Sequence, residues 1–437
     1  WPTDAGPTPA SPFFERLFDQ LAFRAGSRDG EDEFLSIHGL RHPGAPTCPG
    51  AFAVWRRGQH EVLGQGDDGS PFPHSGLEVL REGRFAPPPP AAGLESAERH
   101  EGLAACSLTV PNYNGVEWRR HSFWFAGRGL VVLDQIQAQV TGVYDLRVHY
   151  RLTNPVEVHG ASARTRGGPN LTLDLPAGGA WTVLDAGGRC LAAELRADLA
   201  EGQGLVMATV AAWLQPGGLP SLRVEPASAV AFLVHGLSAD PVVVGLPPAE
   251  WAAVEVECDA RAYALTKDLL YVLGAARFGV GPSYVEASSP SDMVYAPGPG
   301  RISVSSFSGG PLFVGLGSRR FEARVERGHR WESDLTAPRG QVRQLRAAVV
   351  EQAKVYSPPW LIASGQEGRP PRAVGRAVHE RWTLDEPVAD AVEQESSLWV
   401  ALPSGQVAAL DETGTRRPIA SVPAPPTRLA AAGGAVV

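Results

Sequence analysis

Residues 122–153 read SFWFAGRGLVVLDQIQAQVTGVYDLRVHYRLT, and this stretch decides the fold. Apolar and polar residues alternate along much of it with a period of two, which places successive side chains on opposite faces of an extended chain. Gly127, Gly129 and Gly142 interrupt the alternation at the spacing expected of turns. The stretch therefore predicts antiparallel strands joined by short connections.

The same pattern continues from about Glu33 to about Glu326, and residues 301–328, RISVSSFSGGPLFVGLGSRRFEARVERG, repeat it clearly. Turn residues recur roughly every 8 to 12 positions without intervening helices, which excludes a parallel sheet built from βαβ units. We therefore predict an all-β protein whose residues 31–350 form a large antiparallel β-sandwich.

Two segments have apolar residues at helical spacing. The first, FFERLFDQLAFRAG, spans residues 13–26, and the second, QVRQLRAAVVEQAKV, spans residues 341–355. We expect the first to form a short N-terminal helix, as part of a helical tail over residues 1–30 that belongs to a missing domain. The second is a shorter helical candidate.

The C-terminal part has a different composition. Residues 351–380 are rich in Pro, Gly and Ser and predict a linker. In residues 381–437, apolar runs at Leu398–Leu402 and Val407–Leu410 are separated by turn residues and followed by another turn. This repeat resembles one blade of a β-propeller, although an ordinary extra hairpin remains the alternative. One blade cannot close a ring, so we expect further blades beyond Val437 and a chain that is a fragment at both ends.

Composition excludes several classes of function. The net charge is −8, and only two of the 39 basic residues are lysines, which argues against a surface that binds nucleic acid. The four cysteines form no C-x-x-C pair. No apolar run approaches the roughly 18 residues of a membrane-spanning helix. We predict no cofactor, no nucleic-acid partner and no membrane span.

Three segments resemble motifs of one enzyme family. They are FRAGSRDGEDEFLSIHGLRHPGAPTCPGAFAVWRRGQHEVLGQGD at residues 23–67, PFPHSGLEVLREG at residues 71–83, and YNGVEWRRHSFWFAGRGLVVLDQI at residues 113–136. In order and spacing they are similar to the C-terminal β-sandwich of heparinase II/III-like polysaccharide lyases. The resemblance covers about residues 20–335 and implies a secreted or periplasmic protein.

Such lyases remove the C5 proton of a uronic acid and eliminate the C4 oxygen, which requires a base, an acid and a group that neutralises the carboxylate. The resemblance implies that most of these groups come from an upstream helical toroid, so this chain carries half of a site. The family's histidine and aspartate positions are here occupied by Gly44, Pro46, Cys48 and Gly64. We therefore predict no metal site.

A nearby set of residues is the best candidate for remaining chemistry. We predict catalytic roles for Arg41, His42 and Tyr113, and substrate-binding roles for His74, Trp118 and Arg120. Arginine pairs with carboxylates through two hydrogen bonds, and tryptophan stacks on sugar rings. Ordinary explanations stay open: His42 and His74 as turn and strand-entry residues, and Trp118 with Arg120 as core packing on one strand face.

Two functions remain open. In the first, the chain is the β-sandwich portion of a lyase that acts on acidic polysaccharide and needs its upstream toroid. In the second, it is a non-catalytic glycan-binding or scaffolding module coupled to a β-propeller. The substitutions at Gly44, Pro46, Cys48 and Gly64 favour the second function for this chain alone.

Overall fold

The protein is described by a computed structural model. It describes side chains in most of residues 16–335, with gaps at 26–32, 41–47, 57–58, 64–74, 101, 167–170, 176–178, 186, 214–221, 229, 239, 247–255, 307, 317–318 and 327–328, and beyond residue 342 the backbone of nine strands. The chain divides into two units. One comprises Gln20–Ala353, and the other comprises Trp1–Asp19 with Lys354–Val437.

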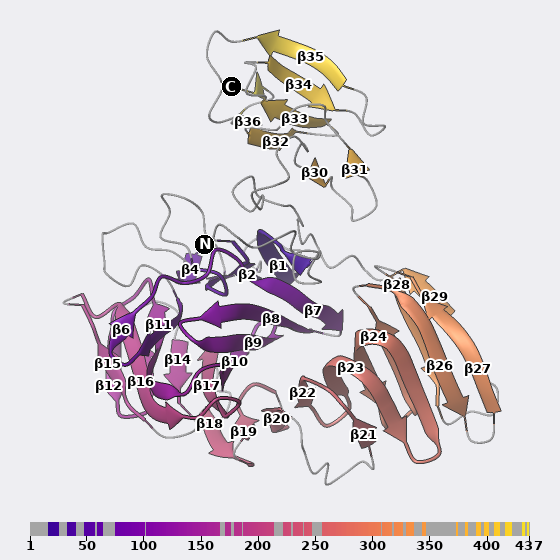
Figure 1. The fold of residues 1–437 in the computed structure, drawn as a ribbon, viewed down its shortest axis with the longest axis horizontal. Helices are drawn as coiled ribbons and strands as arrows, with labels where there is room; N and C mark the ends of the chain where they lie inside the picture. Colours follow the sequence, from indigo (N-terminus) through magenta and orange to yellow (C-terminus); the bar gives the residue numbers. More distant parts are fainter. Residues whose placement is uncertain are drawn as a thin grey trace. The chain divides into compact units, whose positions relative to one another are not determined.

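The described part of the chain is built from antiparallel strands and contains no α-helix, which confirms the all-β prediction (Figure 1). The described strands of the larger unit form four sheets. A four-stranded sheet has the order β1 (Gln20–Ala25), β2 (Glu33–His38), β3 (Phe52–Arg56), β4 (Gln59–Val62). An eight-stranded sheet has the order β12 (Val156–His159), β13 (Ser162–Thr165), β14 (Leu171–Asp174), β17 (Gly204–Trp213), β10 (Gly129–Ala138), β9 (Val116–Phe125), β8 (Leu103–Tyr113), β7 (Gly93–His100).

The other two sheets complete this unit. A five-stranded sheet has the order β15 (Trp181–Val183), β16 (Cys190–Leu199), β11 (Gly142–Arg151), β5 (Gly76–Arg81), β6 (Arg84–Phe85). The main path of a twelve-stranded sheet is β18 (Arg223–Pro226), β19 (Ala231–His235), β20 (Val242–Gly245), β22 (Ala262–Leu265), β23 (Leu270–Val280), β24 (Ser283–Ala296), β25 (Arg301–Ser305), β28 (His329–Asp334), β29 (Arg343–Arg346). Three strands branch from this path: β21 (Val256–Cys258), β26 (Gly310–Leu316), β27 (Arg319–Val325).

The two helix predictions are wrong where the structure describes them. Gln20–Ala25 form β1, in which Leu21 and Phe23 are buried while Gln20 and Arg24 are exposed. This alternation is that of a strand, and Phe23 pairs with Leu35 of β2. The pairing with β2 overrides the helical spacing of the apolar residues further upstream. Likewise, Arg343–Arg346 pair with β28 as β29.

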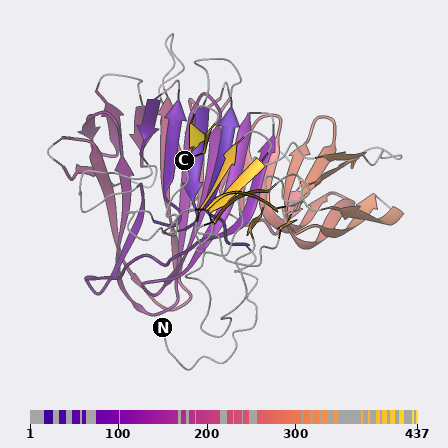
Figure 2. The ribbon, with the colours of Figure 1, turned by 90° about the horizontal axis from the view of Figure 1, so that it is seen from above.

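The eight-stranded sheet is covered on both faces because its strands alternate between two sets of apolar side chains. On one face, Phe123, Val131 and Val210 pack in a core with Phe232 and Leu273 of the twelve-stranded sheet. On the opposite face, the five-stranded sheet is tied down by hydrogen bonds from Tyr144 Oη to Gly115 O, at 3.1 Å, and from Asn114 Nδ2 to Val79 O, at 2.9 Å. Figure 2 shows the eight-stranded sheet beside the twelve-stranded sheet, which is drawn in salmon and orange.

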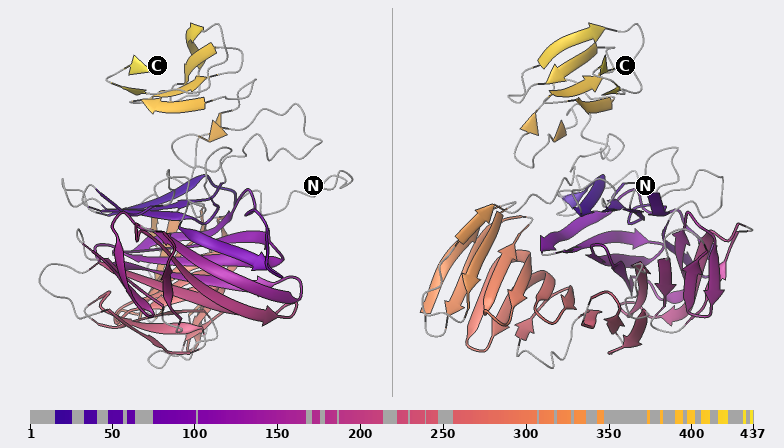
Figure 3. Two further views of the ribbon diagram at one scale, coloured as in Figure 1. Left: turned by 90° about the vertical axis from the view of Figure 1, so that its left-hand side faces the viewer. Right: turned by 180° about the vertical axis from the view of Figure 1, so that it is seen from behind.

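The four-stranded sheet lies against the same side as the five-stranded sheet, and Figure 3 shows its indigo strands alongside the purple strands of the sandwich. The twelve-stranded sheet divides at β24. The first half of β24 pairs with β26, and the second half pairs with β25. A second core fills the space between these branches, and Phe278, Val285, Leu312, Trp331 are among its buried members.

The smaller unit contains an antiparallel sheet of four strands in sequence order: β32 (Asp390–Gln394), β33 (Ser397–Ala401), β34 (Gln406–Leu410), β35 (Arg416–Ser421). Two short pairs accompany it: β30 (Ala373–Val374) with β31 (Arg381–Trp382), and β36 (Ala431–Ala432) with β37 (Ala435–Val436). The apolar runs at residues 398–402 and 407–410 thus correspond to two adjacent strands. In neither unit does a described helix have the length and hydropathy needed to cross a membrane.

Candidate functional site

Two segments that carry predicted site residues lie between described strands of the sandwich. Arg41 and His42 fall in residues 41–47 and His74 in residues 64–74, and all three lie outside the described residues. The residues that flank these segments are bonded to one another. Phe52 N donates to Ser75 O at 3.2 Å, and Ser75 Oγ donates to Leu63 O at 2.8 Å. Ser75 therefore links the start of β3, the residue after β4 and the start of β5.

Gly50, just before β3, is held by a buried ion pair. Arg120 on β9 donates through Nε and Nη2 to the two carboxylate oxygens of Asp134 on β10, at 2.7 and 2.8 Å. Its remaining terminal nitrogen, Nη1, donates to Gly50 O at 2.7 Å. Trp118 Nε1 donates to Asp134 Oδ1 at 2.7 Å. Gly50, whose φ is +82°, packs against the indole of Trp118.

This geometry changes the roles expected of three predicted site residues. Trp118 and Arg120 are both 0% exposed, and their polar groups are used inside the sandwich. Tyr113 is 2% exposed, its hydroxyl donates to Leu77 O at 3.4 Å, and burial raises the pKa of this phenol far above its ordinary value. An enclosed indole cannot stack on a sugar, and an enclosed phenol has no path for proton transfer to solvent. In this structure the three side chains support the loop ends rather than facing a ligand.

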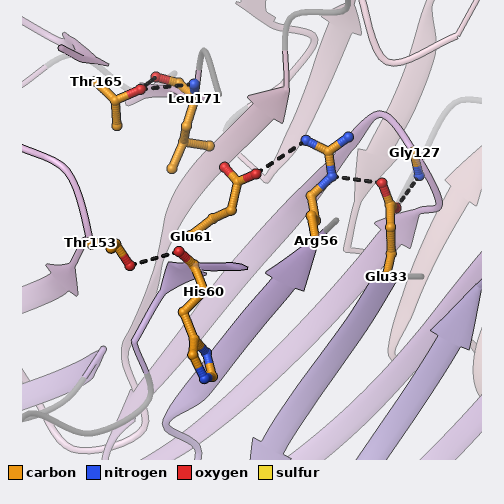
Figure 4. Close-up of polar contacts among 8 residues, drawn as sticks. All are labelled: Glu33, Arg56, His60, Glu61, Gly127, Thr153, Thr165 and Leu171. Atoms are coloured by element: carbon orange, nitrogen blue, oxygen red, sulfur yellow. Dashed lines mark hydrogen bonds and ion pairs between the residues drawn. The ribbon is translucent and has the colours of Figure 1, made fainter. Parts of the chain in front are cut away.

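A second buried cluster fixes the four-stranded sheet (Figure 4). Arg56 Nε donates to Glu33 Oε1 at 2.6 Å, and Arg56 Nη1 lies 3.5 Å from Glu61 Oε1. Glu33 also accepts a hydrogen bond from Gly127 N, in the turn between β9 and β10, at 2.5 Å. The guanidinium lies over the ring of Trp213, 4.9 Å from its centroid. Because burying a charge is costly unless it is paired, this cluster holds β2, β3 and β4 in one position on the eight-stranded sheet.

A row of charged side chains next to Ser75 is not among the predicted site residues. In β11, Tyr144, Leu146, Val148 and Tyr150 face the core, so the alternate residues Asp145, Arg147, His149 and Arg151 lie on the outer face of the five-stranded sheet. The backbone N of Arg151 donates to Ser75 Oγ at 2.9 Å, and His149 is the register partner of Gly76. This polar row therefore starts where residues 64–74 rejoin the sheet.

The row is electrostatically organised. Arg147 lies between Glu78, at 3.4 Å from Nη1, and Glu194, at 2.8 Å from Nε. His149 Nε2 lies 3.4 Å from the same oxygen of Glu78. Burial alone would raise the pKa of Glu78, but the hydrogen bond to His149 and the charges of His149 and Arg147 lower it, so this carboxylate stays ionised.

Exposure of the row changes along its length. The Glu194 side chain is 57% exposed and Arg147 is 29% exposed, whereas His149 and Arg151, the two residues of the row closest to Ser75, are 2% and 8% exposed. An arginine that is open to solvent and held by carboxylates can exchange one of them for a ligand carboxylate or sulfate. Within the part of the chain that the structure describes, no group of three or more His, Cys, Asp or Glu side chains is placed to hold a metal ion.

A signal for this row was present in the sequence. YDLRVHYR, residues 144–151, alternates large apolar residues with Asp, Arg, His and Arg, which is the pattern of a strand with one polar face. In the sequence this stretch indicates a strand, whereas the predicted site residues lie in the segments that resemble the lyase motifs. The pairing of Glu78 with His149 joins residues 71 positions apart, so local pattern alone does not reveal it.

Comparison with known proteins gives likenesses of shape only. No family model matches the chain, and no curated protein matches its sequence. A mutant of heparan sulfate lyase HepC from Pedobacter heparinus superposes with a TM-score of 0.41 and 14% identity, covering 52% of this chain and 41% of that one. A heparinase III gene product gives a TM-score of 0.38 and 11% identity, covering 64% and 41%.

A third structure is named for a different activity. It is a putative aldose 1-epimerase from Escherichia coli K12. The match covers the whole of that protein and 45% of this chain, with a TM-score of 0.29 and 9% identity. With every one of these TM-scores below 0.5, the likenesses identify neither a family nor an activity. The chain spans about two fifths of the length of the two lyases.

Proposed function

We propose that this chain is the β-sandwich portion of a heparinase II/III-like protein, and that it binds acidic, uronate-containing polysaccharide at the end where residues 41–47 and 64–74 attach. One observation carries the proposal: Ser75 is bonded to Phe52 at the start of β3, to Leu63 after β4 and to Arg151 in the polar row of Arg147, His149 and Arg151. The motif resemblance over residues 20–335 supports the ligand class.

The chemistry of this end suits an anionic polymer. Arg147 supplies a guanidinium whose planar donors match a carboxylate, and the sequence before Ser75 holds Arg41, His42 and His74, which lie outside the described residues. Glu194, exposed and 2.8 Å from Arg147, would compete with a ligand carboxylate for the same donors. Binding should therefore weaken when Arg147 is removed and strengthen when Glu194 is neutralised.

Catalysis makes larger demands than binding. Elimination at a uronate needs a base at C5, an acid at O4 and a partner for the carboxylate, all within hydrogen-bond reach of one sugar. Tyr113 is enclosed, which leaves His42 and His74 as the proton-transfer candidates of this chain. We therefore propose that the chain alone binds the polymer, that cleavage requires an upstream toroid domain, and that the protein works in a secreted or periplasmic setting.

The test separates binding from cleavage. Titration of the whole chain with polyuronate and with an uncharged polysaccharide measures binding, and ultraviolet absorbance of the unsaturated product measures cleavage. The proposal predicts binding to the charged polymer alone, with no rise in absorbance. Equal affinity for the two polymers, or no binding to either, would overturn it. His42→Ala and His74→Ala variants of any longer, cleaving form should abolish the absorbance signal.

A second function is favoured by the smaller unit. Strands β32, β33, β34 and β35 form an antiparallel meander in sequence order, which is the layout of a propeller blade. We propose as the alternative a non-catalytic glycan-binding or scaffolding module coupled to a β-propeller. In that case a longer form with its upstream domain would bind polyuronate and release no unsaturated product.

A further inference from the structure

An aromatic row with basic side chains at its ends crosses the outer face of the four-stranded sheet. Strand register places Arg24 of β1 opposite Phe34 of β2, and Phe34 opposite Trp55 of β3. Trp55 in turn lies opposite His60 of β4. Arg24 and His60 are exposed, and the two rings between them are half-buried. At the usual strand spacing of about 4.8 Å, the aromatic row extends over about 14 Å.

Neighbours in the aromatic row contact one another. The Arg24 guanidinium lies over the Phe34 ring, 5.2 Å from its centroid. The rings of Trp55 and His60 meet edge to face, with their centroids 4.6 Å apart. Because these contacts restrict the side-chain rotamers, less conformational entropy is lost when a ligand binds on the row. The aromatic row is therefore a prearranged surface of rings with polar groups at both ends.

Charge is separated between the two faces of this sheet. The carboxylates of its four strands are those of Glu33 and Glu61, and both are buried against Arg56 on the inner face. The outer face carries the Arg24 guanidinium and the His60 ring, which points away from the Arg56 cluster in Figure 4. An anionic ligand on the outer face therefore meets a cation and a ring N–H, while both carboxylates are turned inward.

The chain also has an exposed ring with the opposite surroundings. Phe313 of β26 is 48% exposed, and its register partners are Glu286 of β24 and Glu322 of β27. This ring therefore has a carboxylate on each neighbouring strand, and those charges disfavour an anionic polymer. Exposed rings thus occur in two electrostatic settings, and the four-stranded sheet provides the one that suits an acidic sugar.

We propose that the aromatic row is a second contact for the acidic polysaccharide, on which sugar rings stack and carboxylates pair with the terminal groups. A pyranose ring presents C–H groups on its faces, which suit the half-buried rings of Phe34 and Trp55. A uronate carboxylate at the edge of the sugar suits the planar donors of Arg24 and the ring N–H of His60. Because the row crosses four strands, it takes a short stretch of polymer rather than a single sugar.

The aromatic row is separate from the polar row around Arg147. Trp55 is three positions from Phe52 in β3, so it lies about 10 Å along the strand from the bond between Phe52 and Ser75. Substitutions in the aromatic row therefore leave the residues at Ser75 in place. The ligand class rests on the proposed function, whereas the location rests on the register and contacts of the four strands.

Titration of the whole chain with polyuronate tests this contact through paired variants. Trp55→Ala removes the larger ring and should weaken binding about tenfold, whereas Trp55→Phe keeps a ring and should stay within about threefold. Arg24→Gln removes the charge at an exposed position and should weaken binding about fivefold. The matched control, Phe313→Ala, removes an exposed ring beside carboxylates and should leave binding unchanged. The urea midpoint of each variant shows whether its fold is intact.

The outcomes distinguish this contact from the proposed function. Binding that weakens in Arg147→Ala but is unchanged in Trp55→Ala and Arg24→Gln would overturn the contact alone. Equal losses in Trp55→Ala and Phe313→Ala would also overturn it. No binding of polyuronate by the unmodified chain would overturn the contact together with the proposed function. If Trp55→Ala did not fold, the comparison of Arg24→Gln with Phe313→Ala would decide, and equal affinities of these two variants would count against the contact.

Discussion

Arg120 and Asp134 are register partners on adjacent strands, and their side chains form a two-bond ion pair that is fully enclosed by the sandwich. The same guanidinium donates to Gly50 O. One buried pair therefore couples the centre of the eight-stranded sheet to the end of the loop that carries Arg41 and His42.

Removing one partner of this pair should be costly. Asp134→Asn leaves the Arg120 charge buried without its counter-ion, and we expect a loss of about 3 to 5 kcal/mol in the free energy of unfolding. Urea denaturation measures it. The control is Arg119→Ala on the same strand, whose partner Glu117 lies at 2.5 Å and whose side chain is 30% exposed, so its loss should be about 0.5 kcal/mol or less. Similar losses in the two variants would contradict the account of a buried anchor.

Alanine substitutions at two glycines distinguish the cost of backbone strain from the cost of a packing clash. Gly50 has a φ of +82°, and a Cβ there would lie 2.6 Å from Trp118 Cη2. Gly83 has a φ of +68° with no heavy atom within 4 Å of the same position. Gly83→Ala should therefore cost about 1 kcal/mol, and Gly50→Ala should cost at least about 2 kcal/mol more because Trp118 must move. Equal midpoints in urea would show that Trp118 is not held as described.

His121 should make the stability of the protein depend on pH. Burial lowers the pKa of His121 to about 4, and the neutral ring lies with Nδ1 2.6 Å from Ser107 Oγ and Nε2 3.4 Å from Gln135 Oε1. Because the folded pKa is depressed, this stabilisation is present above about pH 6.5 and is lost as the pH falls toward 4.

Burial raises the pKa of Asp292 to about 7, so the stabilisation that this carboxyl provides is present in acid and is lost as the pH rises, opposite to that of His121 over nearly the same pH window. In wild type their effects on unfolding free energy largely offset, whereas Asp292→Asn should reveal a loss on the order of 2 kcal/mol between pH 6.5 and pH 4. Denaturant titrations at several pH values measure the slope. The same slope in wild type and variant would mean that Asp292 does not titrate as its surroundings indicate.

The sequence predicted strands much better than it predicted their partners. Residues 122–153 form the end of β9, then β10 and β11, and residues 301–328 form β25, β26 and β27, as the alternation indicates. Alternation does not reveal that β10 pairs with β17, whose residues lie about 75 positions later, or that a second sheet covers the face of Phe123. Pairing and layering depend on contacts that are distant in sequence.

The site was harder to predict for a related reason. The strand pattern correctly places Trp118 and Arg120 on one face of β9, yet burial of that face depends on Gly50 and Phe52, which lie about 70 residues earlier. The pairing of Glu78 with Arg147 and His149 is equally non-local. A polar face is visible in the sequence, whereas its neighbours and its exposure are decided by the fold.

In the polar row, changes at two neighbouring residues, Glu194 and Arg147, should alter the affinity for polyuronate in opposite directions. Neutralising Glu194 should strengthen binding of polyuronate, because the carboxylate that competes for Arg147 is lost while Glu78 still holds the guanidinium. We expect Glu194→Gln to lower the dissociation constant about threefold. Weaker binding by Glu194→Gln would mean that Arg147 is not the ligand's partner.

The central claim is tested most directly by isothermal titration of the whole chain with a polyuronate oligosaccharide, comparing Arg147→Ala with Arg196→Ala. Arg196 lies on the same outer face, 3.7 Å from Asp145 and farther along the strand from Ser75. If the loop-bearing end binds the polymer, Arg147→Ala weakens binding about tenfold while Arg196→Ala leaves it within about twofold. Equal effects of the two variants, or no binding by the unmodified chain, would contradict the claim.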